Sequence, residues 1–141
     1  FQGWNDGESD SFLEEYEQNL THLVTDIRND LSQPNLPIVI ANSGHGGFAT
    51  STDLWVRNMQ DIVAVAQENV GCNDSIYGGR VGFVETKQFY QEASDSPLDA
   101  IHHYNNNALT YLNIGKEMGD EMILTINDMA RPSRRIARHM E

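Results

Sequence analysis

The sequence predicts an α/β fold of three layers, in which a parallel sheet has helices on both faces. Helical and strand-like segments alternate along the 141 residues in the order helix, strand, helix, strand, helix. The first strand-like segment, residues 37–41, is a short continuous apolar run, which is typical of a strand buried on both faces. Such a chain length suits a single domain. Open sheets usually have about four to six strands, so two strands and an abrupt start at Phe1 predict a domain that is incomplete at its N-terminus.

The first helix is predicted from apolar residues that recur at three- and four-residue steps. These residues are Leu13, Tyr16, Leu20, Leu23, Ile27 and Leu31. Ser9 or Asp10 is the expected N-cap, and acidic residues crowd the first turns, where the helix dipole favours them. The helix should end near Leu31, because Pro34 and Pro37 follow.

A buried strand is predicted over residues 37–41, a short β-branched run bounded by turn residues. The glycine density of residues 42–47 predicts a loop directly after it. A second helix should begin at Thr52 or Asp53 and end at Gly71 as a C-cap. Its apolar stripe comprises Trp55, Met59, Ile62, Val63, Ala66 and Val70.

The second strand is predicted over residues 80–86, and a polar loop follows through residues 93–97. The third helix should begin within residues 105–108 and run to about residue 126. Its expected apolar stripe comprises Leu109, Leu112, Met118, Met122 and Ile123. We therefore divide the chain into a domain portion, 1–126, and a basic tail, 127–141, with Arg131, Arg134, Arg135, Arg138 and His139.

Composition excludes several classes of function. The chain has 9 Lys and Arg against 21 Asp and Glu, a net charge of −12. Nucleic acids and anionic membranes require a basic surface, so neither is an expected partner. A single cysteine, Cys72, excludes an internal disulfide and a cysteine-based zinc cluster. No third His or Cys lies at ligand spacing from His102 and His103, so we expect neither a metal nor a cofactor.

Polar residues gather at two predicted loop positions where they could perform chemistry. In Gly3-Trp4-Asn5-Asp6, the Asn5 amide could donate to a developing oxyanion, although the same residues favour an ordinary turn. In the segment 99–104, Asp99 precedes His102 and His103 at the spacing with which a carboxylate orients an imidazole. The alternative there is a polar turn with Asp99 as an N-cap.

A third candidate is the glycine-rich loop after the first strand, residues 43–47. Its backbone N–H groups could meet an oxyanion or a phosphate. His45 within it could contact substrate or be a surface residue without a role. No G-x-S-x-G, P-loop or G-x-G-x-x-G pattern occurs in the chain.

Taken together, these segments resemble a known family. Gly3-Trp4-Asn5-Asp6 matches the G-x-N-D block of the SGNH (GDSL-like) hydrolases, and Asp99-Ala100-Ile101-His102 matches their D-x-x-H block. The chain is most similar to the sialate O-acetylesterase-like branch, which is related to the family six carbohydrate esterases. The segments that carry this likeness over residues 1 to about 126 are 1–3, 27–31, 37–40, 84–90, 96–97 and 103–111.

The resemblance implies a role for each candidate residue. Asn5 would be an oxyanion-hole donor, and Asp99 with a histidine would form the acid–base half of a Ser-His-Asp triad. D-x-x-H spacing selects His102, whereas the longer His103-Tyr104-Asn105 block selects His103, which we favour. The residues expected to contact substrate are Gly3, Trp4, Asp6, His45 and Tyr104.

The family's nucleophilic serine belongs to an N-terminal block that is absent from this sequence. The serines at positions 9, 11, 43 and 51 do not lie in such a block. Without a nucleophile the covalent step cannot proceed. We therefore expect this chain alone to have no meaningful esterase activity and to need the missing N-terminal segment of the same domain.

The leading hypothesis is a serine carbohydrate O-acetylesterase present as a partial domain, with an acetylated carbohydrate as substrate. The alternative is a non-catalytic carbohydrate-binding or interaction domain, in which Trp4, Trp55 and Tyr104 stack on sugar faces. A lipid esterase of the same superfamily is a third hypothesis. The resemblance favours an extracellular or periplasmic location, and the sequence leaves the oligomeric state open.

Overall fold

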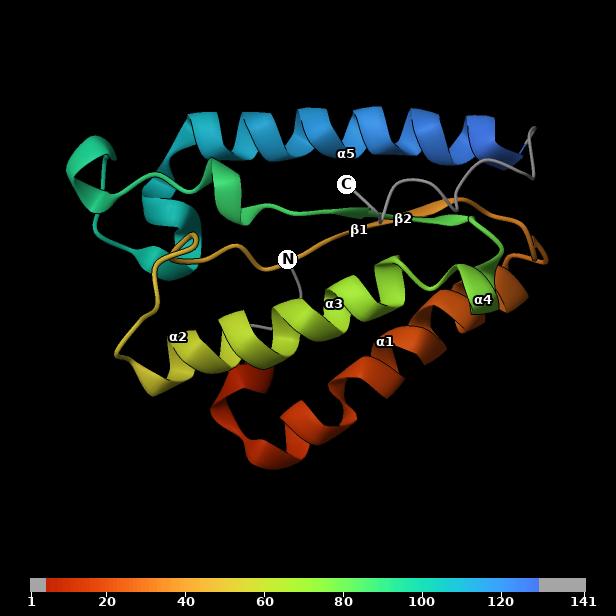
Figure 1. Ribbon diagram of the computed structural model, residues 1–141, viewed down its shortest axis with the longest axis horizontal. Helices are drawn as coiled ribbons and strands as arrows, with labels where there is room; N and C mark the ends of the chain where they lie inside the picture. The colour runs from red at the N-terminus through yellow and green to blue at the C-terminus, as the bar shows by residue number, and fades with distance from the viewer. Residues whose placement is uncertain (1–4, 130–141) are drawn as a thin grey trace.

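In the computed structural model, the described part of the chain comprises residues 5–129, and it is arranged in layers (Figure 1). The helices are α1 (Asp10–Asp30), α2 (Leu54–Asn58), α3 (Ala64–Gly71), α4 (Asp74–Tyr77) and α5 (Ala108–Met129), and the strands are β1 (Ile38–Ala41) and β2 (Val81–Val84). Short 3-10 segments at Asn5–Glu8, Lys87–Phe89, Ala93–Asp95 and Ile101–Asn106 and a π turn at Met59–Val63 complete the order.

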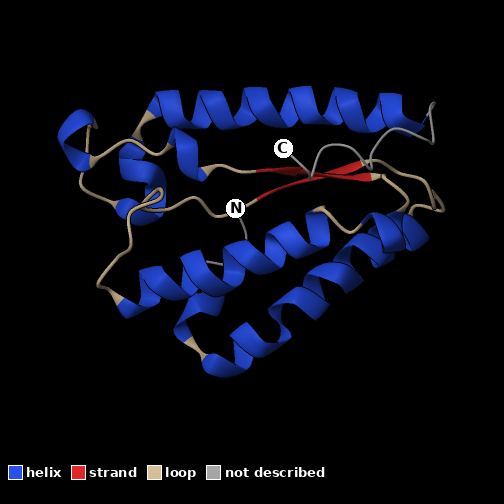
Figure 2. Ribbon diagram, viewed as in Figure 1, coloured by secondary structure: helices blue, strands red, loops and turns tan. Residues whose placement is uncertain are grey.

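The two strands pair in parallel, as the sequence predicts, with Ile38 opposite Val81 and Ala41 opposite Val84. Figure 2 shows the strands between α5 on one side and α1 with α3 on the other. Ile40 and Val81 pack with Val24 of α1 and Val70 of α3. The described residues therefore form part of an α/β domain in which helices cover both faces of a two-stranded sheet.

Helix α1 begins after Ser9 and ends at Asp30, as predicted, but its buried face differs from the expected stripe. Leu23 and Leu31 are 51% and 58% exposed, so their predicted burial is wrong. Val24 and Arg28 face the interior instead. The Arg28 guanidinium donates to the carbonyls of Leu36 and Arg80, just before β1 and β2. This anchor sets the rotation of α1 about its axis.

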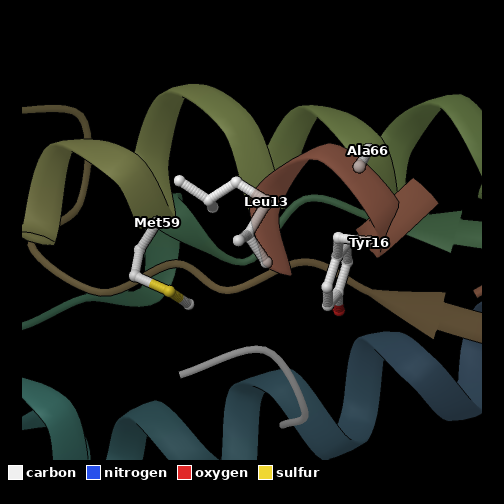
Figure 3. Packing of buried hydrophobic residues seen from close by; sticks show 5 residues of the cluster. Leu13, Tyr16, Met59 and Ala66 are labelled. Atoms are coloured by element: carbon white, nitrogen blue, oxygen red, sulfur yellow. The ribbon is translucent and has the colours of Figure 1, made fainter. Parts of the chain in front are cut away.

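The second predicted helix is a continuous helical segment, residues 54–71, with a π turn in its middle. Asp53 is its N-cap, and the carboxylate accepts from the Val56 N–H at 3.1 Å. Figure 3 shows Met59 and Ala66 of this segment close to Leu13 and Tyr16 of α1. Ile62 is 41% exposed, so its predicted burial is wrong. A π turn inserts an extra residue and shifts the stripe around the helix.

Helix α3 ends at Gly71, as predicted, but Gly71 is the last helical residue and not a left-handed C-cap, so that part of the prediction is wrong. A Cβ at Gly71 would lie 2.9 Å from the Cβ of Phe83, which means that the glycine permits close packing of α3 on β2. The left-handed cap is Gly78, with φ 58°, after the short helix α4. Glycine thus marks the helix–sheet contact at one position and the chain reversal at the next.

Helix α5 has the predicted position but turns a different face to the sheet. Thr110, Ile114 and Thr125 are buried, whereas Leu109, Leu112 and Ile123 of the predicted stripe are exposed. A Cβ at Gly82 would lie 2.5 Å from the Thr125 hydroxyl, so this contact admits only small side chains. The helix continues to Met129, past the predicted boundary at residue 126, and the tail from residue 130 onward lies outside the described residues.

Candidate active site

The candidate site lies at the carboxyl ends of β1 and β2, where parallel α/β sheets commonly bind ligands. Asn42 follows β1, and Thr86 follows β2 after Glu85. The Asn42 amide accepts from the Thr86 N–H at 2.7 Å and donates to the Glu85 carboxylate at 2.8 Å. The Thr86 hydroxyl donates to the Asn42 carbonyl at 2.8 Å. These bonds connect the two segments of the chain just beyond the ends of the strands and fix the positions at which the two following loops begin.

The loop after β1, residues 42–49, is called the glycine loop here. Gly46 and Gly47 have φ values of 77° and 62°, a region that favours glycine. A Cβ at Gly44 would collide with the Thr86 side chain and with the Lys87 backbone. The predicted loop is therefore confirmed, and its glycines serve both the turn and a close approach to the chain that follows β2.

Two buried glutamines on the helical segment 54–71, called the crossover helix here, form hydrogen bonds with the glycine loop. The Gln60 amide, on the π turn, donates to the carbonyls of His45 at 3.2 Å and Ala49 at 3.1 Å. Gln67, on α3, accepts from the Ser43 N–H at 2.7 Å. The Ser43 hydroxyl lies 3.4 Å from the Gln67 amide nitrogen. Backbone groups of the loop are thus paired with helix side chains.

The loop after β2 leads to residues 98–106, called the histidine turn here. Tyr104, Asn105 and Asn106 have consecutive φ values of 48°, 53° and 55°. Left-handed backbone is uncommon outside glycine, although Asn adopts it more readily than most residues. Tyr104 is 1% exposed, and its hydroxyl accepts from the Gly44 N–H at 2.9 Å. The histidine turn is therefore attached directly to the glycine loop.

His45 lies between the glycine loop and the histidine turn. It is 3% exposed, and its ring stacks on that of Tyr104 with centroids 4.5 Å apart. Burial, with a smaller contribution from the charge of His102, lowers the pKa of His45 to about 4. A hydrogen bond between His45 and the backbone of His102 acts in the opposite direction. The imidazole is therefore neutral at pH 7, and it packs against Tyr104 of the histidine turn.

The predicted acid–base residues share one exposed turn. Asp99, His102 and His103 are all exposed, and the two imidazole centroids lie 4.3 Å apart. No hydrogen bond joins the Asp99 carboxylate to the His103 ring in the described part of the chain. Catalytic hydrogen bonds are often long without substrate and tighten when it binds. The roles of these residues stay predictions.

The N-terminal candidates lie against the crossover helix. Asn5 is exposed and begins the 3-10 turn Asn5–Glu8, in which Asp6 is half-buried. The Asn58 amide of α2 donates to the Gly7 carbonyl at 3.0 Å and fixes this turn. Figure 1 shows the turn (red) below the helical segment 54–71, whereas the histidine turn (teal) lies above that segment, at the left of the view. Gly3 and Trp4 lie outside the described residues.

Sequence reasoning missed the polar side chains that build this region. They are Asn42, Gln60, Gln67, Thr86 and Asn105, all of them buried. Gln60 and Gln67 lie seven residues apart within the apolar part of a helix, and a polar residue at a core position is a signal for such a role. Asn42, Thr86 and Asn105 carry no comparable signal, because polar residues in loops are ordinary.

The described residues contain neither a metal-binding cluster nor a membrane-spanning helix. Within residues 5–129, no cluster of His, Cys, Asp and Glu side chains has the arrangement needed for a metal ion. No helix of that range combines the length and the apolar character of a membrane span.

Comparisons with known proteins give the family of the chain. A family model described as carbohydrate esterase, sialic acid-specific acetylesterase, matches residues 1–123. Searches of curated proteins and of solved structures find no match to the chain. Because the family model covers most of the sequence, the chain belongs to the carbohydrate esterase family of sialic acid-specific acetylesterases.

Proposed function

We propose that the chain provides the acid–base part of a serine O-acetylesterase that removes acetyl groups from carbohydrates. The observation that supports this proposal is the histidine turn, which carries Asp99 and His103 and is bonded through Tyr104 to the loop that follows β1. Membership of a carbohydrate esterase family gives the reaction class. The acetylated sugar itself is proposed only at the level of that class.

The proposed mechanism assigns one step to each group. A serine Oγ attacks the acetyl carbonyl carbon while the His103 imidazole takes its proton. Asp99 orients the imidazolium, and the Asn5 amide donates to the tetrahedral oxyanion. The sugar oxygen leaves with the proton from His103, and water then hydrolyses the acetyl-enzyme with His103 again as base. Gly3, Trp4 and Asp6 would hold the substrate beside Asn5.

The backbone of the turn favours His103 over His102 as the base. The His103 N–H donates to the Ala100 carbonyl at 2.9 Å, and its own carbonyl accepts from the Tyr111 hydroxyl at 2.9 Å. The backbone of His102 bonds instead to the buried His45. His103 is therefore fixed on the side of the turn that continues into α5, while His102 adjoins the glycine loop.

We propose that the nucleophile comes from a segment outside these 141 residues. Ser43, the buried serine nearest in sequence to the strand end, is held beside Gln67. No G-x-S-x-G pattern occurs in the sequence. We further propose that β1 and β2 belong to a wider parallel sheet of a three-layer SGNH-type domain, since two-stranded open sheets are uncommon.

The second candidate function is a carbohydrate-binding domain without catalysis. It is favoured by the absence of a G-x-S-x-G pattern from the sequence. His45 and Tyr104 would then serve only to shape a binding surface, since both are buried.

Acetate release from an O-acetylated sialic acid separates the two functions. We expect no release by the 141-residue chain above that of its Asp99→Ala variant. A polypeptide in which this chain follows a nucleophile-bearing strand–loop segment should release acetate, and Asp99→Ala should reduce the rate at least about 100-fold. Sugar binding without acetate release by that longer polypeptide would support the binding domain. Acetate release by the short chain alone would refute the proposed source of the nucleophile.

A further inference from the structure

We propose that Asn105 is the positioning residue of the esterase site, and that it holds Asp99 and His103 in one fixed register. The proposal rests on the function proposed above, because it concerns how the acid–base pair of that reaction is held. Asn105 is 0% exposed. It acts through the backbone on both sides of Asp99.

Asn105 first brackets Asp99. The N–H of Leu98 donates to the Asn105 carbonyl at 3.2 Å, and the N–H of Ala100 donates to the Asn105 side-chain oxygen at 2.9 Å. One residue therefore binds the backbone immediately before and immediately after the carboxylate. The position of the Asp99 Cα is set by these two bonds.

The same residue is also tied to His103 through Ala100. The Ala100 carbonyl accepts from the N–H of His103 and from the N–H of Asn105, each at 2.9 Å. Asp99 and His103 are thus connected through Ala100, the residue next to Asp99, and not through a long loop. Rotation of one relative to the other would break a bond to Asn105 or to Ala100.

The side-chain amide nitrogen of Asn105 fixes this unit to the rest of the domain. It donates to the Tyr90 hydroxyl at 2.9 Å and to the Gln91 carbonyl at 2.9 Å. Residues 90 and 91 follow the 3-10 segment Lys87–Phe89 that leads away from β2. The buried Asn105 amide therefore fixes the histidine turn to the segment that follows β2, and both of its polar atoms have hydrogen-bond partners.

Backbone conformation explains why an asparagine can occupy this position. Asn105 has φ 53°, where an L-residue other than Asn or Gly is strained. Glycine would adopt the conformation but would lose the three side-chain hydrogen bonds. Asparagine combines tolerance of this φ with a side chain that both donates and accepts.

The neighbouring Asn106 offers a matched control. It has φ 55°, but its side chain is exposed and no hydrogen bond of that side chain is described. The substitutions Asn105→Gly and Asn106→Gly therefore make the same chemical change in the same backbone region. Only the first removes the bonds to Ala100, Tyr90 and Gln91.

The first experiment measures amide hydrogen exchange by NMR in the 141-residue chain. Asn105→Gly should lower the protection of the Leu98, Ala100 and His103 amides by at least about tenfold, and Asn106→Gly should leave all three unchanged. Asn105→Asp keeps the acceptor for Ala100 and should retain protection there if Asn105→Gly fails to fold. Unchanged protection of the three amides in Asn105→Gly would overturn the proposal, and so would lost protection of the Ala100 amide in Asn105→Asp if the glycine variant fails to fold.

The second experiment measures kcat and KM for acetate release by the longer polypeptide that carries the nucleophile. Asn105→Gly should lower kcat about 100-fold and change KM little, because a misplacement of about 1 Å costs that much in rate. Asn106→Gly should leave both constants unchanged. Lost protection with an unchanged kcat would overturn the positioning role. If the unmodified polypeptide releases no acetate, the proposed function fails, and the exchange result still decides whether Asn105 holds the turn.

Discussion

The glycine loop and the histidine turn follow neighbouring parallel strands, but they are held in different ways. The glycine loop is held from outside, because Gln60 and Gln67 on the crossover helix bind its backbone. The histidine turn contains its own clamp, because Asn105 binds Ala100 within the same segment. The loop reaches left-handed backbone with glycines, and the turn reaches it with Tyr104 and two asparagines.

The two segments also differ in what they do with their histidines: the glycine loop buries its histidine, and the histidine turn exposes both of its own. His45 of the glycine loop is buried beneath Tyr104, while Asp99 and His103 of the histidine turn are exposed. A segment that must present side chains to a substrate cannot bury them against a helix, so it has to be held by another, buried residue of the same segment, here Asn105. We therefore expect the glycine loop to govern stability and the histidine turn to govern catalysis.

The largest effect on stability should come from the closest approach of the glycine loop. Gly44→Ala should lower the free energy of unfolding by at least about 3 kcal/mol, because the added Cβ meets the Lys87 backbone, which cannot move aside easily. Gly115→Ala on α5 is the control, since nothing lies within 4 Å of its Cβ position. That variant should be more stable than the parent by about 0.5–1 kcal/mol. Urea unfolding checks both, and equal effects would contradict the close contact.

A pH effect of similar size should come from His45. Its pKa is lowered to about 4 in the folded chain from the ordinary 6.5, chiefly by burial. Between these values the unfolded chain binds more protons, so the free energy of unfolding should fall as the pH decreases from 6.5 to 4, by about 3 kcal/mol. Above pH 6.5 and below pH 4 this group should add no further change.

The His45→Gln variant isolates that effect from the titration of carboxylates. The difference between parent and variant in urea unfolding should shrink from pH 7 to pH 4.5, because only the parent carries the buried imidazole. A constant difference over that interval would show that His45 titrates normally in the folded chain.

A smaller effect should follow from removing one clamp of the glycine loop. Gln60→Leu leaves the carbonyls of His45 and Ala49 without their donor and should cost about 2 kcal/mol of stability. Gln88→Leu removes an exposed bond to the Glu85 carbonyl and should change stability by less than about 0.5 kcal/mol. Thermal unfolding of the two variants measures the contrast, and similar midpoints would mean that the helix does not hold the loop.

The sequence predicted the elements well because periodicity and turn residues act locally. The starts of α1 and α2 at Ser9 and Asp53 are as predicted, and so is the parallel pairing of the two strands. The buried faces were predicted less well. On α1, Arg28 is buried and Leu23 is exposed, because the hydrogen-bond partners of Arg28 lie next to both strands. On α5, Thr110 is buried and Leu109 is exposed, because the smaller side chain fits the close contact of α5. Such choices depend on tertiary contacts.

The candidate site was predicted in part for the same reason. Asp99, His102 and His103 stand out in the sequence because reactive residue types recur at short spacing. The residues that hold them, among them Asn105 and Gln60, are common polar types in ordinary positions. Their importance arises from burial and from partners many residues away, as with Asn105 and Tyr90. No pattern in the neighbouring sequence indicates such burial or such partners.

The most direct test of the account compares His102→Ala with His103→Ala in the polypeptide that carries the nucleophile. His103→Ala should lower kcat for acetate release about 1,000-fold or more, as expected for loss of a general base. His102→Ala should lower it less than about tenfold, because that residue lies beside the base without carrying the proton. A larger loss for His102→Ala, or equal losses for the two variants, would contradict the assignment of His103 and of the turn that holds it.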